Sequence, residues 1–275
     1  MTSDHVARLV LELDVGNTRA KWRLLQAVDA GAGDALASGA VNRRDSRPNS
    51  TSNVQYGLDL APIEAAWQGL GRRPLQAIRV ASVASHDFDL ALAAQLQTQF
   101  NQVPGFAHTV RQCAGVRCGY REPMHMGVDR WLALLAAHAR EAQDQLVVSA
   151  GTAVTLDLLQ ADGTHLGGYI VPGLWLMQSS LGQGTADVQV RDGRDPVRAS
   201  IAPGVTTPEA VQHGTLLILV RAIEALASDG RAVVLCGGDA ALLAACLPAP
   251  SHEVPELVLD GLALSALGPP QPILR

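Results

Sequence analysis

The segment that most constrains the fold is an apolar run near the start of the chain that ends in an acidic residue and a tight turn. Leucines alternate with other side chains over residues 9–13, which predicts a strand that ends near Asp14. A turn of small residues follows at 16–18, and a second strand is expected over 21–25. The turn N–H groups, the carboxylate and the cation of Lys21 together suit a nucleotide phosphate with its Mg²⁺. An ordinary hairpin turn with a capping Asp explains the same residues about equally well.

A second copy of this pattern lies in the middle of the chain. Over residues 146–158 an apolar strand again leads through a small-residue turn into another apolar strand. Ser149 takes the place of Asp14 in this copy, and Thr152 takes the place of Asn17. The duplication favours the phosphate interpretation over the plain hairpin and predicts two domains rather than one.

Two α/β lobes with one phosphate turn each resemble the actin, Hsp70 and sugar kinase superfamily. In that fold two ribonuclease H-like lobes each contribute one hairpin to the ATP polyphosphate, with the active site in the cleft between them. We therefore expect an N-terminal lobe over residues 1–126 with the first phosphate hairpin. A C-terminal lobe over residues 127–275 is expected to hold the second hairpin and the turn Gly237-Gly238-Asp239.

Composition and charge argue against several other classes of protein. Hydrophobic residues make up 48% of the 275 residues and charged residues 17%, which indicates a well-buried globular chain. The net charge of −5 and the absence of a long basic cluster argue against nucleic acid as the main partner. Residues 1–5 lack the start of a signal peptide, and no apolar run approaches the ~20 residues of a membrane span, so a cytoplasmic location is expected. The cysteine spacing favours free thiols at Cys113, Cys118, Cys236 and Cys246.

The rest of the chain alternates short strands and helices, as α/β packing requires. The stretch rich in Gly, Ala, Ser, Asn and Arg over residues 31–60 is expected to be a surface loop or hairpin tip. The other elements expected from local pattern are a helix over 88–100 capped by Asp87, a helix from 128 to about 143, a helix starting with Thr207 as its N-cap, a strand over 254–259 and a short helix over 261–267.

An acidic and a basic residue stand side by side at the start of one predicted helix. Asp129 and Arg130 follow a loop that contains Tyr120, and both fall in the first helical turn. Asp129 can be no more than a favourable charge at a helix N-terminus. The pair can also hold a hydroxylated acid, since the carboxylate accepts from a hydroxyl and the guanidinium binds a carboxylate or phosphate. The residues alone leave both interpretations open.

A pair of glycines follows the predicted strand over residues 232–236. The turn Gly237-Gly238-Asp239 lets a phosphate or flat ring approach the backbone closely, but a tight βα turn capped by Asp239 fits at least as well. Neither a P-loop nor a complete dinucleotide fingerprint is present in the sequence.

Taken together and in order, these motifs resemble the type III pantothenate kinase family, some members of which are called Bvg accessory factor family proteins. The resemblance spans nearly the whole chain. The motifs that carry it are Asp14-x-Gly16-Asn17-Thr18-x-x-Lys21, Tyr120-x-x-Pro123-x-x-x-Gly127-x-Asp129-Arg130-Trp131, Gly151-Thr152-Ala153-x-Thr155-x-Asp157, Gly167-Gly168-x-Ile170-x-Pro172-Gly173 and Gly237-Gly238-Asp239.

The resemblance implies ATP-dependent phosphorylation of pantothenate, the first step of coenzyme A synthesis, by a homodimer that uses Mg²⁺ and a monovalent cation, K⁺ or ammonium. Asp129 would be the general base, and Asp14 would hold Mg²⁺. The implied ATP-binding residues are Asp14, Val15, Gly16, Asn17, Thr18, Arg19, Ala20, Lys21 and Thr152. The implied pantothenate-binding residues are Tyr120, Gly127, Val128, Asp129, Arg130 and, from the partner subunit's side, Thr207.

The sequence departs from the family at one position that matters. Ser149 stands where members usually carry the Asp that binds an activating K⁺ or ammonium ion. A neutral hydroxyl is a weaker ligand, so the cation site is weakened, rebuilt from other oxygens or lost, unless backbone carbonyls still hold the ion. Two alternatives therefore stay beside the kinase: an accessory or regulatory protein with faded catalysis, and a related small-molecule kinase.

Overall fold

The computed structural model describes residues 7–28, 32–44, 56–184 and 199–271. The chain forms two compact units, each described below by itself. The first unit contains the chain up to Ala114, residues 120–132 and the segment from Val258 onward, and the second contains residues 115–119 and 133–257. This division differs from the expected boundary after residue 126, because the last segment of the chain returns to the sheet of the first unit.

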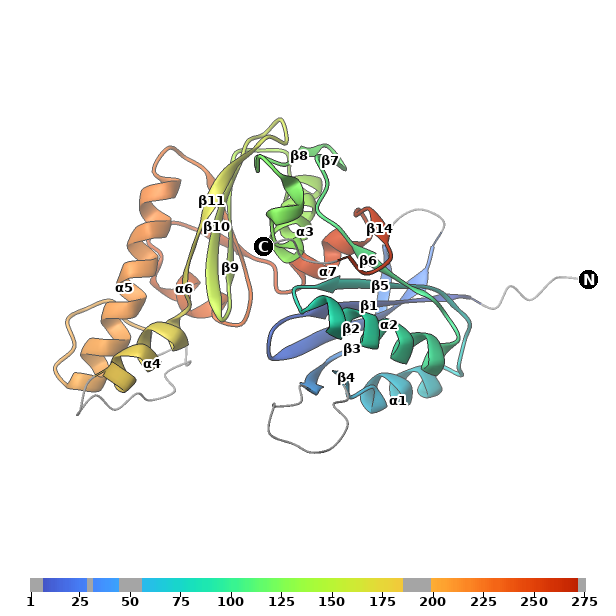
Figure 1. Cartoon of the computed structure of the whole chain (residues 1–275). Coiled ribbons are helices and arrows are strands. Elements are labelled where there is room, and N and C mark those ends of the chain that lie inside the picture. Colours follow the sequence, from blue (N-terminus) through green and yellow to red (C-terminus); the bar gives the residue numbers. More distant parts are fainter. Residues whose placement is uncertain (1–6, 29–31, 45–55, 185–198, 272–275) are drawn as a thin grey trace, which may run out of the picture. The chain divides into compact units, whose positions relative to one another are not determined.

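The first unit is built on a mixed sheet. Among the described residues its strands run in the order β14-β6-β5-β1-β2-β3-β4 (Figure 1). The strands are β1 (Leu9–Val15), β2 (Arg19–Ala27), β3 (Ala32–Arg44), β4 (Gly57–Leu58), β5 (Leu75–Ser82), β6 (Pro104–Ala107) and β14 (Leu267–Gly268). The other elements that start in this unit are α1 (Ala61–Gly69), α2 (His86–Phe100), β7 (Gln112–Cys113), the 3₁₀ helix η1 (Pro123–His125), and α3 (Val128–Arg140), which runs on into the second unit.

The alternation of leucines in β1 sets the two faces of this sheet. Leu11 and Leu13 are fully buried and pack with Ile63 of α1 and Phe88 of α2. Because successive side chains of a strand point to opposite faces, Glu12 lies on the other face. The apolar core of the unit therefore lies on the α1–α2 face, and the other face of β1 carries carboxylates.

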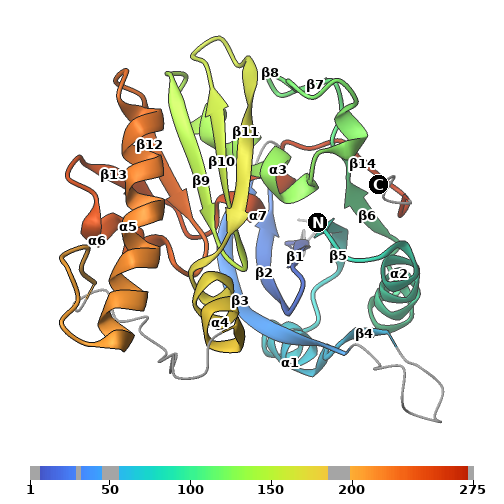
Figure 2. The same ribbon diagram turned by 60° about the vertical axis from the view of Figure 1, so that its left-hand side comes forward.

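The second unit contains a separate mixed sheet, with the order β11-β10-β9-β12-β13 (Figure 2). Its core lies on the face covered by helices, where the sheet packs against α4, α5 and α6. The elements of this unit are β8 (Val116–Arg117), β9 (Gln145–Ala150), β10 (Ala153–Leu159), β11 (His165–Pro172), α4 (Leu174–Gly184), α5 (Thr207–Ala227), β12 (Ala232–Cys236), α6 (Ala240–Cys246), β13 (Ser251–Glu253) and α7 (Leu257–Leu262), which ends in the first unit.

The two sheets share one topology over five strands. In the first unit β1 is antiparallel to β2 and parallel to β5, and β5 is parallel to β6. In the second unit β9 is antiparallel to β10 and parallel to β12, and β12 is parallel to β13. The third strand, β3 or β11, extends each hairpin with another antiparallel pair. The duplication predicted from two short motifs is thus confirmed as a repeat of strand order and direction.

The prediction of a surface loop or hairpin tip over residues 31–60 is wrong as a loop over most of its described residues, but its strands β3 and β4 pair antiparallel, as in a hairpin. Residues 32–44 form the 13-residue strand β3, and residues 57–58 form β4, while residues 45–55 lie outside the described part. The glycines that suggested a loop have a packing role here. A Cβ on Gly39 would lie 3.0 Å from the Trp22 ring of the neighbouring strand, so the ring occupies that space.

Both predicted helix caps are shifted by one or two residues. Ser85, not Asp87, caps α2, since its hydroxyl accepts from the N–H of Phe88 at 3.3 Å. Thr206, not Thr207, caps α5, where it accepts from the N–H of Glu209. In both cases the capping residue has the extended backbone that an N-cap requires.

The end of the chain was also predicted wrongly, and α3 ends at Arg140 rather than near 143. Residues 257–262 form the helix α7 where a strand over 254–259 was expected, and residues 267–268 form β14 where the last helix was expected to end. A short apolar run cannot be assigned to helix or strand by periodicity alone.

Helix α5 has an unusual balance of apolar and exposed residues. Among the described residues it is the one helix long and apolar enough to cross a membrane by length and composition, and 28% of its most apolar window is buried. The sequence analysis found no such run. Its core side is formed by Leu216, Leu219, Val220 and Ile223, whereas Ile218 is 61% exposed.

Candidate phosphoryl-transfer site

The first of the two hairpins predicted to bind phosphate has the expected strand–turn–strand form. Asp14 at the end of β1 pairs across the hairpin with Lys21 of β2, and the N–H of Gly16 donates to the carbonyl of Arg19 at 3.1 Å. The side chains of residues 17–19 are exposed. Val15 and Ala20 are fully buried, so any contact that they make with a nucleotide comes from the backbone. The turn thus exposes the side chains of residues 17–19 between two buried apolar residues.

Arg43 of β3 braces this turn and was not among the predicted site residues. Its Nη1 donates to the carbonyl oxygen of Gly16 at 2.9 Å. The guanidinium also lies over the ring of Phe88, 4.3 Å from the centroid. A single isolated Arg-Arg pair in the sequence carries no signal for such a role, because the contact joins residues 27 positions apart.

The predicted acceptor residues lie together at the start of α3. The Asp129 carboxylate accepts the N–H of Arg130 at Oδ1, 2.9 Å away. A Cβ on Gly127 would lie 2.7 Å from the same Oδ1, so a side chain at residue 127 would crowd the carboxylate. Arg130 is 4% exposed, and its Nη1 donates to the Tyr120 hydroxyl at 2.6 Å. The three predicted residues Tyr120, Asp129 and Arg130 therefore form one connected polar group.

The Tyr120 loop is held by another arginine that the sequence analysis missed. Arg111 donates from Nη1 to the carbonyl of Tyr120 at 2.7 Å and from Nη2 to the carbonyl of Arg121 at 2.5 Å. Two hydrogen bonds from one planar guanidinium fix both position and orientation of the backbone. Arg111 thus fixes the loop from which the Tyr120 hydroxyl meets Arg130.

A cavity of about 290 Å³ in the first unit opens beside Gly127 and Val128. It is lined by residues 82–83, 106–109 and 124–128, together with Asp89 and Gln271. The N–H of Val83 donates to the carbonyl of Val15 at 3.2 Å, so one wall of the cavity adjoins the end of the strand that carries Asp14. The predicted phosphate hairpin therefore adjoins a cavity whose lining includes Gly127 and Val128 of the predicted acceptor segment.

Two titratable side chains of this cavity have shifted pKa values. Burial raises the pKa of the Asp89 carboxyl, although the Ser82 hydroxyl, which donates to its Oδ1 at 2.5 Å, acts in the opposite direction. Burial lowers the pKa of His108, against the effect of its contact with the carbonyl of Pro269. The wall of the cavity therefore has an imidazole with a lowered pKa and a carboxyl with a raised pKa.

Glycines from three of the predicted motifs, Gly151, Gly173 and Gly237, pack closely at the second hairpin, in the second unit. The N–H of Gly151 donates to the carbonyl of Ala153, and the N–H of Gly173 donates to the carbonyl of Thr152. A Cβ on Gly173 would lie 2.1 Å from the Gly151 oxygen. Gly237 has φ 96°, and a Cβ there would lie 2.2 Å from the oxygen of Ala150. The glycines are thus required by close backbone packing around the turn that exposes Thr152.

Ser149 lies at the position in β9 that Asp14 occupies in β1. Its cross-strand partner is Thr155, and its partner on the parallel strand is Cys236. The carboxylate of the same motif, Asp157, accepts a hydrogen bond from Nε2 of the buried His165 at 3.0 Å. All four cysteines are free thiols.

The fit of a Mg²⁺ ion rests on Asp14. Magnesium is usually held by one or two carboxylates together with substrate phosphates and water, not by a complete protein cage. A half-buried carboxylate at the end of a strand, next to a turn whose residues 17–19 are exposed, fits that requirement. Among the described residues no group of three or more His, Cys, Asp and Glu side chains could hold a metal by itself.

The repeated sheet topology with a phosphate-type hairpin in each unit defines a member of the actin, Hsp70 and sugar kinase fold class. A solved structure from Sinorhizobium meliloti, described as a 2-dehydro-3-deoxygalactonokinase protein, has the same fold with a TM-score of 0.51. It is 18% identical and covers 92% of this chain and 97% of its own.

Within that class the chain belongs to the type III pantothenate kinase family, whose model matches residues 10–229. A type III pantothenate kinase from Pseudomonas paraeruginosa is 39% identical over 267 residues, and one from Pseudomonas aeruginosa is 38% identical over 266 residues. Each alignment covers 94% of this chain and 98% of the relative.

Proposed function

We propose that this protein transfers the γ-phosphoryl group of ATP to the primary hydroxyl of pantothenate, which gives 4′-phosphopantothenate and ADP. Family membership over nearly the whole length identifies a kinase. The observation that carries the assignment of the site is the connected group Tyr120–Arg130–Asp129 beside a cavity that adjoins the phosphate hairpin.

The first hairpin would hold the nucleotide phosphates. Backbone N–H groups of the exposed turn residues 17–19 would bind phosphate oxygens, Lys21 would neutralise charge, and Asp14 would hold Mg²⁺. When bound, Mg²⁺ neutralises the charge that develops on the transferred group. Thr152, from the second hairpin, is assigned to ATP as well. Because this transition state is largely dissociative, positioning and charge stabilisation contribute most of the rate.

The start of α3 would hold the acceptor. Asp129 accepts the proton of the primary alcohol, which leaves late, so a carboxylate of ordinary strength is sufficient. Arg130 is nearly buried, and the Tyr120 hydroxyl accepts one of its N–H groups, which orients the guanidinium for an acidic substrate. The cavity beside Gly127 and Val128 is partly apolar, with Phe106 and Met126 in its wall, and suits the branched acyl part of pantothenate.

The test is ADP release by the purified protein with Mg·ATP and pantothenate. Turnover that requires pantothenate supports the proposal, and a strong preference for a sugar or acetate would replace it with a related kinase activity. Absence of turnover with every acceptor would favour an accessory or regulatory role.

The monovalent cation belongs to the same proposal. Ser149 faces Thr155 across the hairpin, so this position offers hydroxyl oxygens in place of a carboxylate. We expect turnover to depend on K⁺ or ammonium, with hydroxyl and backbone oxygens rebuilding the cation site. The same assay with K⁺, with ammonium and with neither measures this, and equal turnover without either cation would contradict it.

We also propose that the protein is a cytoplasmic homodimer that pairs through the α4–α5 face. A groove of about 580 Å³ runs along these helices, and Thr207 lies in its wall. Large apolar side chains are exposed there, including Leu181 at 42% and Ile218 at 61%. A second copy would cover this face and bring Thr207 to the neighbouring site. Light scattering of the wild type and of Ile218→Asp tests it: we expect a dimer and a monomer respectively, and a monomeric wild type would refute the proposal.

A further inference from the structure

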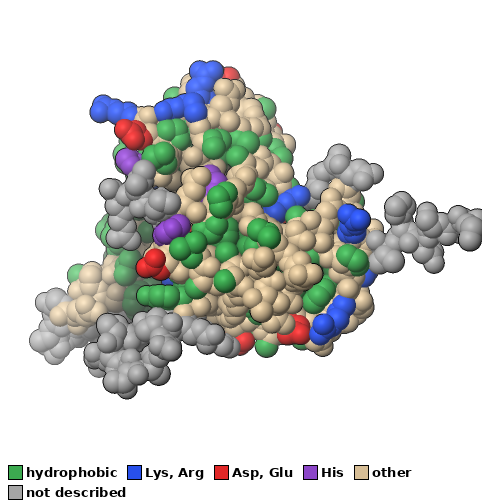
Figure 3. Space-filling view, turned by 45° about the vertical axis from the view of Figure 1, so that its right-hand side comes forward, with side chains coloured by type: hydrophobic (Ala, Val, Ile, Leu, Met, Phe, Trp, Pro, Cys, Tyr) green, Lys and Arg blue, Asp and Glu red, His purple; other side chains and the backbone are tan. Residues whose placement is uncertain are grey.

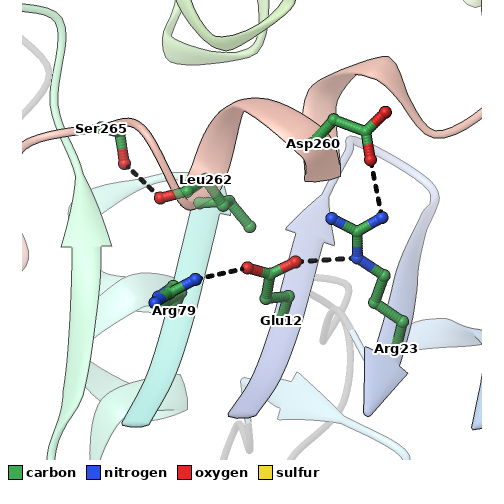
Figure 4. Close-up of polar contacts among 6 residues, drawn as sticks. All are labelled: Glu12, Arg23, Arg79, Asp260, Leu262 and Ser265. Carbon is green, nitrogen blue, oxygen red and sulfur yellow. Dashed lines mark hydrogen bonds and ion pairs between the residues drawn. The ribbon is translucent and has the colours of Figure 1, made fainter. Parts of the chain in front are cut away.

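Four charged side chains form a connected group on the face of the first sheet that lies away from the α1–α2 core (Figure 4). The Glu12 carboxylate on β1 accepts from Arg23 Nε at 2.8 Å and from Arg79 Nη1 at 2.9 Å. Arg23 on β2 also donates from Nη1 to Asp260 Oδ1 of α7 at 2.8 Å. We call this group the Glu12–Asp260 chain.

The Glu12–Asp260 chain begins next to the Asp14–Lys21 pair of the predicted phosphate hairpin. Glu12 pairs in register with Arg23, and the next pair on the same face toward the turn is Asp14 with Lys21. Two residues along a strand span roughly 7 Å. The guanidinium of Arg23 is thus the neighbour, on the same strand and the same face, of the Lys21 ammonium that the proposed function assigns to ATP.

At its other end the Glu12–Asp260 chain lies next to α3, the helix that carries the proposed base Asp129. Asp260 is followed by Gly261, where a Cβ would lie 2.2 Å from the carbonyl oxygen of Leu132. The backbones of α7 and α3 therefore touch at this point, and only a glycine permits it. Leu132 is three residues after Asp129, which is about one helical turn.

Stability is a poor explanation for such a group. Glu12 is fully buried, and the Arg23 side chain is 8% exposed, so both charges are largely removed from water. Buried ion pairs often contribute no more than apolar side chains of the same volume, because desolvation offsets their attraction. Their geometry, in contrast, is specific: one guanidinium bridges two carboxylates from different elements at 2.8 Å each.

We propose that Arg23 and Asp260 are positioning residues, which hold α7, and through it the start of α3 with Asp129, at a fixed distance and angle from the Asp14–Lys21 hairpin. The inference rests on the proposed function, in which these two places hold the acceptor and the phosphates. Misplacement by about 1 Å can cost roughly 100-fold in rate. Loss of the Asp260 carboxylate should therefore slow the chemical step more than it weakens binding of either substrate.

The test compares Asp260→Ala with Asp229→Ala, a control that removes a carboxylate paired with Arg231 in the second unit. For Asp260→Ala we expect kcat to fall by roughly tenfold or more, with KM for ATP and pantothenate changed by less than about threefold. Asp229→Ala should keep wild-type values. If Asp260→Ala does not fold, Asp260→Asn decides, since its amide oxygen can still accept from Arg23 without the charge; we expect an intermediate loss of kcat.

A second readout does not depend on activity. Trp131 of α3 is fully buried next to Leu132, so its ¹⁹F resonance in 5-fluorotryptophan-labelled protein reports the position of that helix. We expect Asp260→Ala to shift or broaden this resonance and Asp229→Ala to leave it unchanged. An unchanged kcat, or a rise in KM alone, in an active enzyme would overturn the inference. If the wild type does not phosphorylate pantothenate, the proposed function fails, and an unshifted Trp131 resonance would then overturn the coupling itself.

Discussion

Replacing Arg43 tests whether the phosphate turn depends on a brace from β3. Arg43→Ala removes the 2.9 Å hydrogen bond to the Gly16 oxygen and the stacking of the guanidinium over Phe88. A hydrogen bond from a charged donor contributes about 1.5–3 kcal/mol, and a partly exposed cation–π contact about 0.5–1 kcal/mol. Since Arg43 is only half-buried, we expect the free energy of unfolding to fall by about 2 kcal/mol.

For a protein of this size that loss lowers Tm by roughly 4–8 °C. A less ordered turn should also raise KM for ATP by about fivefold, which corresponds to about 1 kcal/mol, with KM for pantothenate unchanged. Arg43→Lys should give intermediate values, because an ammonium keeps the charge but not the planar fork.

Differential scanning fluorimetry and initial-rate kinetics measure both effects. Arg72→Ala is the matched control, since its guanidinium stacks on Trp67 and pairs with Glu64 in the same unit, but with a side chain 56% exposed. Equal Tm and equal ATP KM in wild type and Arg43→Ala would refute the bracing role.

Three further variants have defined outcomes. Asp129→Asn should lower kcat by roughly 10²–10⁴-fold and leave ATP affinity in a nucleotide titration nearly unchanged; a wild-type rate would exclude Asp129 as the base. Gly237→Ala should reduce the free energy of unfolding in urea by about 3 kcal/mol or more, since φ is 96° and the new Cβ would lie 2.2 Å from the Ala150 oxygen. Burial raises the pKa of Asp89 in the folded state, so wild-type stability decreases as pH rises from about 3.9 through that pKa. The Tm of Asp89→Asn relative to wild type should therefore increase between about pH 4 and pH 7, and a constant difference would contradict the pKa shift.

The parts of the fold that could be predicted are those whose signal is local. Alternating leucines placed β1 correctly, and two short motifs were sufficient to predict the repeated architecture. Strand β3 could not be recognised, because its glycines are typical of a loop. The reason for the glycine at residue 39 is the Trp22 ring on the neighbouring strand, a contact that the local sequence does not show. The C-terminal helix α7 was missed because a short apolar run fits a strand equally well.

The candidate site divides in the same way. Asp14, Lys21, Asp129 and Arg130 belong to compact motifs, and the structure places Asp14 opposite Lys21 in the hairpin and joins Asp129, Arg130 and Tyr120. Arg43 and Arg111 instead bond to backbone carbonyls of Gly16 and Tyr120 from other elements, and Arg23 pairs with Asp260 across 237 positions. A single sequence cannot predict such contacts, because each residue by itself is indistinguishable from an ordinary surface charge and one sequence shows no covariation between the two positions.

The return of the chain to the first unit has a consequence for its synthesis. Residues 133–257, nearly all of the second unit, are translated as one uninterrupted stretch, and domains generally fold as units during synthesis. The first unit, in contrast, begins with β1 but receives α7 and β14 only after that whole stretch has been made. During this interval Arg23 lacks its partner Asp260, and the edge of β6 that pairs with β14 is open. The unit that starts first is thus completed last. Until β14 is made, the open edge of β6 is a place where another strand can pair wrongly.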